Sequence, residues 1–228
     1  MLYKDKCENI LPSIPDNSID LILTDPPYNI DYQEWDKFLN IEFITSEWYR
    51  ILKDSGSIFC FAGWSFVNEL IKRFDNKLIL NDWIIYDRVK GRGTKKRLIS
   101  TREDILWYVK SDTWIFNKDE AYSTIKKVTK GMGTKNGRDT RALSNVWTDI
   151  SPIVPWSKER ENHPTQKPIA ISDRIIKVFS NEGNTVLDCY AGSGTFLESA
   201  KKLNRKYIGI EEKEEYFYII QNRLNKGE

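Results

Sequence analysis

The stretch "LILTDPPYNI", residues 21–30, ends an apolar run on a carboxylate, two prolines and an aromatic ring. A short continuous run of Leu and Ile is typical of a strand buried in a parallel sheet. Asp25, Pro26, Pro27 and Tyr28 suit neither a packed core nor a tight hairpin turn. We therefore interpret these four residues as part of a functional site at the end of a buried strand.

The composition is that of an ordinary globular protein, with 228 residues, 40% hydrophobic and 30% charged. This length predicts one domain, 1–228. No apolar run approaches the ~18 residues that a membrane span needs, and the N-terminal stretch lacks the apolar segment of a signal peptide. The three cysteines form no CxxC pair and there is one histidine, His163. These counts argue against a disulfide framework and a metal site, and they favour a cytoplasmic location.

Positive charge gathers in the middle of the chain. Residues 84–141 contain 15 Lys and Arg against 7 Asp and Glu, although the whole chain has a net charge of only +2. The stretch "RVKGRGTKKRLISTR" (88–102) alone has seven basic residues. This separation of charge indicates that residues 84–141 form a polyanion-binding face, while the rest of the chain is acidic. The alternative is that residues 84–141 are only a solvated surface region.

Strand-like and helix-like segments alternate, as in an α/β fold. We expect helices at 38–54, 64–74, 164–180, 196–204 and 215–224, and strands at 18–24, 56–62, 80–87, 103–109, 184–188 and 206–211. Between about residues 112 and 150 the pattern dissolves into polar residues, which is typical of an insertion.

The C-terminal unit has the order strand, glycine turn, helix, strand and acid. Gly192 and Gly194 allow the backbone to approach a ligand closely, and Glu211 ends the next strand, where a carboxylate can accept hydrogen bonds from ribose hydroxyls. The third glycine of the dinucleotide fingerprint is missing, and no lysine follows Gly194 as in a P-loop. A nucleoside ligand without a pyrophosphate is therefore favoured.

These segments together resemble the motifs of DNA amino-methyltransferases. "VLDCYAGSGT" and "RKYIGIE" resemble the S-adenosylmethionine-binding motifs, "DPPY" the catalytic motif, and "HPTQKP" (163–168) the segment ahead of the cofactor strand. The order of the motifs, catalytic first and cofactor last, is that of the β class. The resemblance implies a circularly permuted Rossmann-like methyltransferase fold, with a mostly parallel seven-stranded sheet, helices on both faces and a small basic insertion.

The resemblance also implies roles for individual residues. Glu211 would bind the ribose, and Asp5 matches a family acid near the adenine, although Lys4 replaces the usual glycine before it. Cys189 and Tyr190 stand where Pro-Phe is commoner. The residues implied in cofactor binding are Asp5, Asp25, Thr165, Gln166, Lys167, Asp188, Ala191, Gly192, Ser193, Gly194, Thr195 and Glu211. Asp188 as a simple turn cap and His163 as a plain surface residue remain alternatives.

Methyl transfer to an exocyclic amine explains the opening motif. The lone pair of the amine nitrogen is delocalised into the ring of the base. If a carboxylate accepts one N–H bond of the amine and a carbonyl accepts the other, the lone pair turns towards the methyl donor. Asp25 supplies the carboxylate, Pro26 the carbonyl, and Tyr28 a ring on which the base can stack, so that rate comes from positioning. Trp83 and Tyr86 are candidates for a second stacking wall, but alternation along a strand places one of them in the core.

A base must leave the duplex to reach such a pocket, which requires a grip on phosphates. The predicted DNA contacts are Arg88, Lys90, Arg92, Lys95, Lys96, Arg97, Arg102, Lys135, Arg138 and Arg141. We expect the recognised DNA word to be read by the insertion at about 112–150.

Adenine N6 is the expected target, because Asp-Pro-Pro-Tyr in this order goes with adenine in the family. A cytosine-N4 enzyme usually has Ser in place of Asp25, and it remains the alternative. Cytosine-C5 chemistry is excluded because no cysteine follows a proline. RNA and protein-glutamine methyltransferases usually begin the motif with Asn, and a nucleic-acid-binding module without activity does not explain two intact motifs. Dimers are common in the family. Whether this chain forms a homodimer, whether it is paired with a restriction endonuclease and which DNA sequence it recognises are left open by the sequence.

Overall fold

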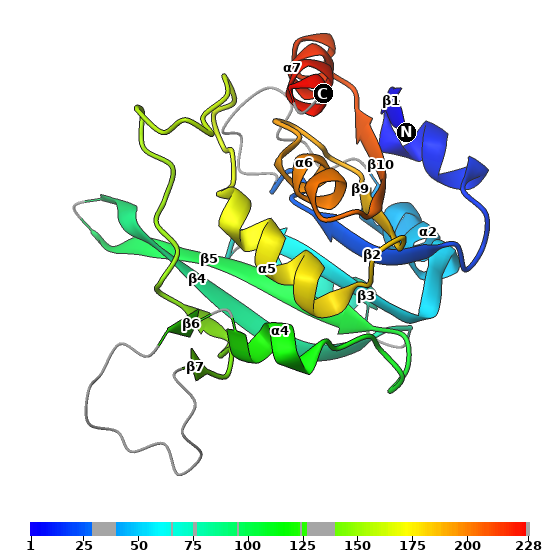
Figure 1. Cartoon of the computed structure of the whole chain (residues 1–228), viewed down its shortest axis with the longest axis horizontal. Helices are drawn as coiled ribbons and strands as arrows, with labels where there is room; N and C mark the ends of the chain where they lie inside the picture. Colours follow the sequence, from blue (N-terminus) through cyan, green and yellow to red (C-terminus); the bar gives the residue numbers. More distant parts are fainter. Residues whose placement is uncertain are drawn as a thin grey trace.

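A mixed β-sheet forms the middle layer of the molecule (Figure 1). The computed structural model describes residues 1–28, 40–64, 66–74, 77–94, 96–123, 125–126 and 140–226. From one edge to the other, the strands of the sheet are β1 (Leu2–Lys4), β10 (Lys206–Glu211), β9 (Thr185–Asp188), β2 (Ile19–Thr24), β3 (Leu52–Ala62), β5 (Arg97–Val109), β4 (Ile79–Thr94) and β8 (Val146–Trp147). Neighbouring strands from β1 to β3 are parallel, and β5 is antiparallel to both of its neighbours.

The expected Rossmann-like fold is confirmed, with one difference in the number of strands. The sheet has eight strands, because the two-residue β8 pairs in parallel with β4 at Ile85 and Tyr86. Trp147 of β8 is buried, so its packing holds this short strand against the sheet. Sequence alternation cannot reveal a strand of two residues.

The permuted order of the motifs places distant segments side by side. β2 pairs in parallel with β9 through Leu21 and Val186, so the strands before "DPPY" and before "CYAGSGT" end at the same edge of the sheet. Thr24 at the end of β2 donates a 2.9 Å hydrogen bond to the Asp188 carboxylate at the end of β9. All six residues of β2 are buried, as expected of a central strand covered on both faces.

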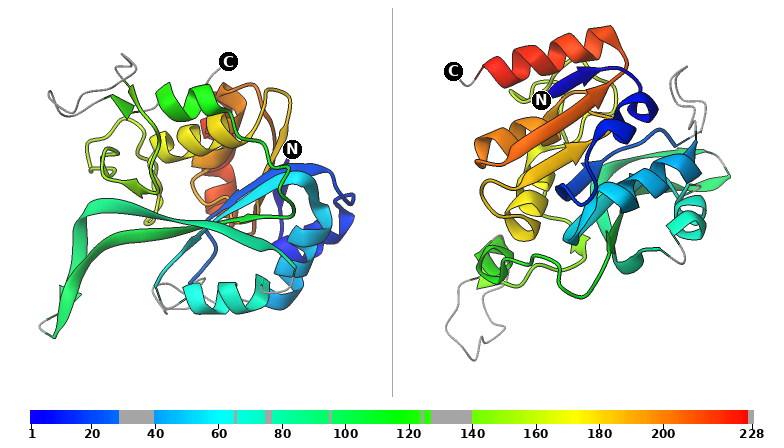
Figure 2. Two further views of the ribbon diagram at one scale, coloured as in Figure 1. Left: turned by 90° about the horizontal axis from the view of Figure 1, so that it is seen from below. Right: turned by 90° about the vertical axis from the view of Figure 1, so that its right-hand side faces the viewer.

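Helices cover both faces of the sheet (Figures 1 and 2). Alternate residues of β2 separate two cores, with Ile22 facing one and Leu21 and Leu23 the other. The first core contains Trp48, and the second contains Phe179. The helices over the first core are α1 (Cys7–Ile10), α2 (Ile41–Ile51) and α3 (Val67–Phe74), and those over the second are α4 (Lys118–Ser123), α5 (Ile169–Phe179) and α6 (Thr195–Lys202). The last helix, α7 (Glu214–Asn225), packs against α6 and β10.

The basic stretch 88–102 extends two strands into an arm. The strand expected at 80–87 continues to Thr94 as β4, and the strand expected at 103–109 begins already at Arg97 as β5. The two strands pair out to Thr94 and Arg97. This β4–β5 arm stands out from the body in Figure 2, left. The apolar side chains of Leu98 and Ile99 near its tip are 95% and 67% exposed. Glycines and basic residues are poor strand formers, which is why the sequence did not predict this extension.

Two further segments differ from expectation. The helix predicted at 164–180 begins only at Ile169, because Pro168 occupies its N-cap and disfavours helical backbone in the residue before it. Part of the stretch 112–150 packs on the core: Ala121 in α4 and Ile150 are buried. Two further short strands of this stretch, β6 (Ile125–Lys126) and β7 (Thr140–Arg141), form a separate antiparallel pair.

The described residues contain no membrane-spanning helix, no candidate metal site and no disulfide bond. No helix there has both the length and the apolar character needed to cross a membrane. No cluster of His, Cys, Asp and Glu side chains there could hold a metal ion. Cys7, Cys60 and Cys189 are buried free thiols.

Candidate active site

A pocket opens at the edge where β2, β9 and β10 end. Eleven of the twelve expected cofactor residues line it, and Gly194 does not. Of the "DPPY" residues, Asp25 and Pro27 line it, whereas Pro26 is buried and Tyr28 lies beside it. The pocket therefore brings the catalytic motif and the cofactor motifs together. Residues that line the pocket beyond the expected set include Lys6, Cys7, Glu8, His163, Cys189, Tyr190, Phe196, Ile210, Glu212, Lys213 and Tyr216.

The glycine turn between β9 and α6 needs its two glycines for backbone reasons. Gly192 has φ +49° and Gly194, at the N-cap of α6, has φ +74°, values that other residues rarely adopt. A Cβ atom at Gly192 would lie 3.0 Å from Nε2 of His163, and one at Gly194 would lie 3.1 Å from the side chain of Ile220. Gly194 thus shapes the turn from outside the pocket.

Two buried carboxylates face the pocket from the ends of neighbouring strands. Asp188 is 1% exposed and accepts hydrogen bonds from Thr24 Oγ1 and from the Tyr190 backbone, so it does cap the following turn. Burial raises the pKa of the Asp188 carboxyl to about 8, although these two bonds oppose the rise. Glu211 accepts backbone hydrogen bonds from Gly192 at 2.8 Å and from Lys213 at 2.9 Å. Burial raises the pKa of Glu211 to about 7.

Asp5 also lines the pocket and lies just after β1. Its Oδ1 accepts bonds from the Lys6 backbone and from the Asn9 side chain, both at 2.7 Å. The bond from Asn9 and then that from Lys6 hold the pKa of Asp5 below its usual value. Asp5 therefore presents a charged carboxylate at the pocket rim.

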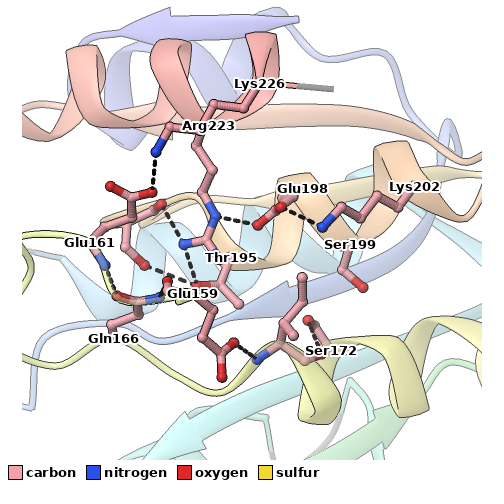
Figure 3. A network of polar contacts seen from close by, with 12 residues as sticks. Glu159, Glu161, Gln166, Ser172, Thr195, Glu198, Ser199, Lys202, Arg223 and Lys226 are labelled. Carbon is pink, nitrogen blue, oxygen red and sulfur yellow. Dashed lines mark hydrogen bonds and ion pairs between the residues drawn. The ribbon is translucent and has the colours of Figure 1, made fainter. Parts of the chain in front are cut away.

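The "HPTQKP" segment (163–168), called the strap below, contributes four of the residues that line the pocket. Gln166 braces it: its Oε1 accepts from the Glu161 backbone at 2.7 Å, and its Nε2 donates to the Glu159 carbonyl at 2.6 Å (Figure 3). His163 is not a plain surface residue, since its ring lies over the glycine turn and 4.5 Å from the ring of Tyr216. Burial lowers the pKa of His163 to about 4, so its ring is neutral at pH 7.

A buried arginine of α7 holds the glycine turn in place. Arg223 of α7 is 4% exposed, and its Nη1 donates to the Ser193 carbonyl and to Thr195 Oγ1, each at 3.1 Å (Figure 3). Its Nε bonds Glu198, which also pairs with Lys202 at 2.6 Å. Arg223 was missed in the sequence because only the fold brings α7 against the turn.

Both oxygens of the Asp25 carboxylate have partners within the protein. The Tyr28 hydroxyl donates to Oδ1, and the ammonium of Lys167 donates to Oδ2. The Tyr28 ring lies 6.2 Å from the ring of Phe66, and a Cβ atom at Gly63 would meet it at 3.1 Å. The motif thus places a carboxylate on the wall of the pocket and an aromatic ring that bonds it beside the pocket.

Comparisons with known proteins assign this architecture to a family. The family model described as "DNA methylase" (N6_N4_Mtase) matches residues 19–222. The type II methyltransferase M.HpaI of Haemophilus parainfluenzae is 37% identical over 228 residues, which cover 94% of this chain and 71% of M.HpaI.

The chain belongs to the N6/N4 DNA methylase family.

Further relatives and solved structures agree. The DNA adenine methyltransferase YhdJ of Escherichia coli is 32% identical over 94% of this methylase and 79% of YhdJ. The type II methyltransferase M.BamHI of Bacillus amyloliquefaciens is 31% identical, but this methylase spans only 54% of its length. A crystal structure of an M1.HpyAVI–SAM complex has TM-score 0.71 and 26% identity over 98% of this methylase and 99% of that chain. The cytosine-N4-specific PvuII DNA methyltransferase has TM-score 0.75 at 16% identity, over 97% and 85% of the two chains, and it supports the fold alone.

The structure describes the side chains of only a few of the residues expected to contact DNA. Arg88 bends inward, 3.3 Å from the Glu103 carboxylate, and Arg102 pairs with Asp104 at 3.3 Å. Lys96 is exposed near the tip of the arm. Lys90, Arg92, Arg97 and Arg141 lie on strands, but their side chains are not described. Lys95, Lys135 and Arg138 fall outside the described residues.

The two aromatic residues considered for a second stacking wall separate as strand alternation predicts. Tyr86 is 1% exposed and belongs to the core. Trp83 is half-buried on the other face of β4, where its indole Nε1 donates to Asp104 at 2.8 Å. Trp64, 66% exposed and directly after Gly63, is a further aromatic residue near the catalytic motif of the methylase that the sequence did not single out.

Proposed function

We propose that this methylase transfers a methyl group from S-adenosylmethionine to the N6 amine of adenine in a specific DNA sequence, after the base has been flipped out of the duplex. The single observation that carries this proposal is the place of Asp25. Asp25 directly follows β2, whose last residue Thr24 bonds Asp188, and its carboxylate lies on the wall of the pocket that the glycine turn and Glu211 complete. A carboxylate at that point can meet an amine that enters beside the cofactor.

The cofactor is S-adenosylmethionine, and the pocket residues suit its parts. Glu211 and Asp188 offer two carboxylates, and Gly192 lines the pocket without a side chain, where a Cβ atom would meet the ring of His163. Carboxylates match the hydroxyls of a ribose and the cationic groups of this cofactor. When bound, the cofactor supplies an electrophilic methyl group. Asp5 would lie towards the adenine, and Thr165, Gln166 and Lys167 would close the other wall.

The residues of the chain would act through position and charge. Asp25 accepts one N–H bond of the amine and the Pro26 carbonyl accepts the other, so that the nitrogen lone pair turns towards the methyl group. The fixed φ of proline holds that carbonyl in one direction. The ring of Tyr28 offers a stacking face, and charge-assisted bonds to Asp25 are roughly twice as strong as neutral ones. Preorganised charge of this kind is a large part of enzymatic rate enhancement.

The choice of adenine rests on Asp25 and on a relative. YhdJ, named a DNA adenine methyltransferase, is similar over most of both chains. The PvuII enzyme, named cytosine-N4-specific, has the same fold, so the fold leaves cytosine N4 as the second candidate. Relatives named type II methyltransferases support a role in restriction–modification, beside a restriction endonuclease. We further propose that the β4–β5 arm grips phosphates and that residues 112–150 read the DNA sequence.

The decisive experiment identifies the methylated nucleoside. The purified protein is incubated with S-adenosylmethionine and mixed-sequence DNA, and the DNA is then digested and analysed by mass spectrometry. We expect N6-methyladenine. A dominant N4-methylcytosine peak would overturn the choice of base, and DNA without any methylated base would overturn the activity. The Asp25→Ala variant, prepared in parallel, controls for a contaminating methylase.

A further inference from the structure

A row of alternating charges leads from the catalytic motif to the β4–β5 arm. Lys167 pairs with Asp25 and lies 3.6 Å from Oε2 of Glu103, and Glu103 Oε1 lies 3.3 Å from Arg88 at the base of the arm. Asp25 follows β2, Glu103 and Arg88 belong to β5 and β4, and Lys167 belongs to the strap. Four segments distant in sequence therefore supply one line of charges.

The first contact in this row opposes the role that methyl transfer requires of Asp25. The Lys167 ammonium donates to Oδ2 while the Tyr28 hydroxyl donates to Oδ1, so the carboxylate is already engaged and its charge is balanced. A carboxylate paired with an ammonium is a weaker acceptor for a neutral amine. For the target amine to bond Asp25 strongly, the ammonium has to move away from it.

Lys167 cannot simply be left without an anion. Its side chain is 7% exposed, and its ammonium lies 5.1 Å from the centre of the Phe61 ring. Burial alone would lower the pKa of Lys167, but Asp25 and Glu103 together raise it, so the side chain keeps its proton at pH 7. An unpaired buried ammonium would be strongly unfavourable.

Glu103 is placed to receive this ammonium. Its side chain is 16% exposed, and within the described parts of the chain its Oε2 accepts no hydrogen bond. At 3.6 Å, the Lys167 ammonium is too far for a good hydrogen bond but close enough to form one after a shift of roughly 1 Å. A buried acceptor oxygen without a donor is unusual in a folded protein.

We propose that Glu103 is a positioning residue, which takes over the Lys167 ammonium when the amine of the target base bonds to Asp25. The ammonium then passes between two carboxylates without losing a counter-ion, and Asp25 recovers its full strength as an acceptor. This inference rests on the proposed function, because it assumes an amine that competes for Asp25.

The pH dependence of the reaction distinguishes this role from a structural one. The charged and titratable groups that act on Lys167 are Asp25, Glu103, Arg88 and His163. Replacing Glu103 by glutamine removes one of the two anions that raise the pKa of Lys167, so the ammonium loses its proton at a lower pH. The variant should therefore regain activity at a lower pH than the wild type as the solution is made more alkaline, because a neutral Lys167 amine no longer holds Asp25.

The test compares single-turnover methyl transfer by the wild-type protein and by Glu103→Gln, with saturating cofactor and DNA. At pH 7 we expect a rate lower by roughly ten- to a hundredfold, the effect of weakening one charge-assisted contact in the reacting complex. The dissociation constant for the cofactor should stay within about threefold, and Glu103→Asp should restore part of the rate. The matched control is Asp20→Asn, which removes a buried carboxylate paired with Lys53 at the other end of β2.

A double-mutant cycle gives the result that would overturn the inference. In a Lys167→Met background there is no ammonium to hold, so adding Glu103→Gln should change the rate by less than about twofold. An equal loss in both backgrounds, or a pH profile parallel to the wild type, would show that Glu103 only supports the sheet. A wild-type protein that transfers no methyl group would instead refute the proposed function itself.

Discussion

Replacing Glu211 by glutamine should weaken cofactor binding and change its dependence on pH. Each carboxylate oxygen of Glu211 already accepts one backbone N–H, at 2.8 and 2.9 Å, which leaves the remaining lone pairs for ribose hydroxyls. The amide of glutamine keeps one acceptor oxygen, while its NH2 group meets a backbone N–H that it cannot bond. Hydrogen bonds to charged groups contribute about 1.5–3 kcal/mol, so the dissociation constant should rise roughly ten- to 150-fold.

The pH dependence follows from the raised pKa of Glu211, about 7 in the ligand-free protein. Below pH 7 the carboxyl is protonated and must release its proton to accept two hydroxyl bonds. Wild-type affinity should therefore fall by up to about tenfold for each pH unit below 7, and this part of the slope should vanish in Glu211→Gln. A slope between pH 7 and 8 should persist, because the pKa of Asp188 is raised to about 8.

Isothermal titration calorimetry at pH 5.5, 7 and 8.5 measures both effects. Glu214→Gln is the matched control, since Glu214 is exposed, pairs with Lys4 and lies outside the pocket. An unchanged dissociation constant for Glu211→Gln would show that Glu211 only holds the backbone of Gly192 and Lys213. A wild-type affinity that does not weaken in acid would refute the linkage.

Three further predictions concern Asp25, the proposed catalytic carboxylate, Asp188, the second pocket carboxylate, and the arm. Asp25→Ala should abolish methyl transfer and leave the cofactor dissociation constant within about threefold; turnover retained in a radiolabel assay would exclude the catalytic role. Asp188→Asn should stabilise the ligand-free protein at pH 8. Burial raises the pKa of Asp188 to about 8, so the folded wild type holds a proton that the unfolded chain releases above pH 4. The wild-type free energy of unfolding therefore falls as pH rises from about 4 to 8, and the variant should lack this fall. Melting curves with the same pH dependence for both proteins would contradict this. Neutralising Lys95, Lys96 and Arg97 together should reduce the slope of log affinity against log salt by about 0.9 per lost phosphate contact; weaker binding with an unchanged slope would place the DNA face elsewhere.

The strands that carry the pocket were predictable because their signals are local. β9 and β10 are short apolar runs that end on Asp188 and Glu211, and Asp25 directly follows the apolar run of β2. The predicted strand at 206–211 agrees with β10 at both ends. Parallel strands end at one edge, so the three carboxylates could be expected to lie near one another.

The contacts between distant elements could not be predicted in this way. Glu103 reads as one of two acidic residues at the start of an apolar run, and Arg223 as one basic residue near the end of a helix. Their partners, Lys167 and Glu198, are 64 and 25 residues away in the chain, and only the packed structure brings them together. His163 was visible in its motif, but its place over Gly192 depends on Pro168 ending the strap before α5 begins.

The adjacency of β2 and β9 also determines the order in which the protein can fold during synthesis. Thr24 and Asp188, which bond across these strands, are 164 residues apart, and the amino group of Met1 bonds the carbonyl of Tyr207, 206 residues away. At roughly 5–20 residues per second, a ribosome needs on the order of ten seconds or more to make the missing neighbour. Throughout that time β2, whose six residues are all buried in the finished sheet, has one open edge, where it can pair with other chains. A rearranged gene that placed the segment from residue 164 onwards first would supply β9 before β2, and its product should aggregate less during translation.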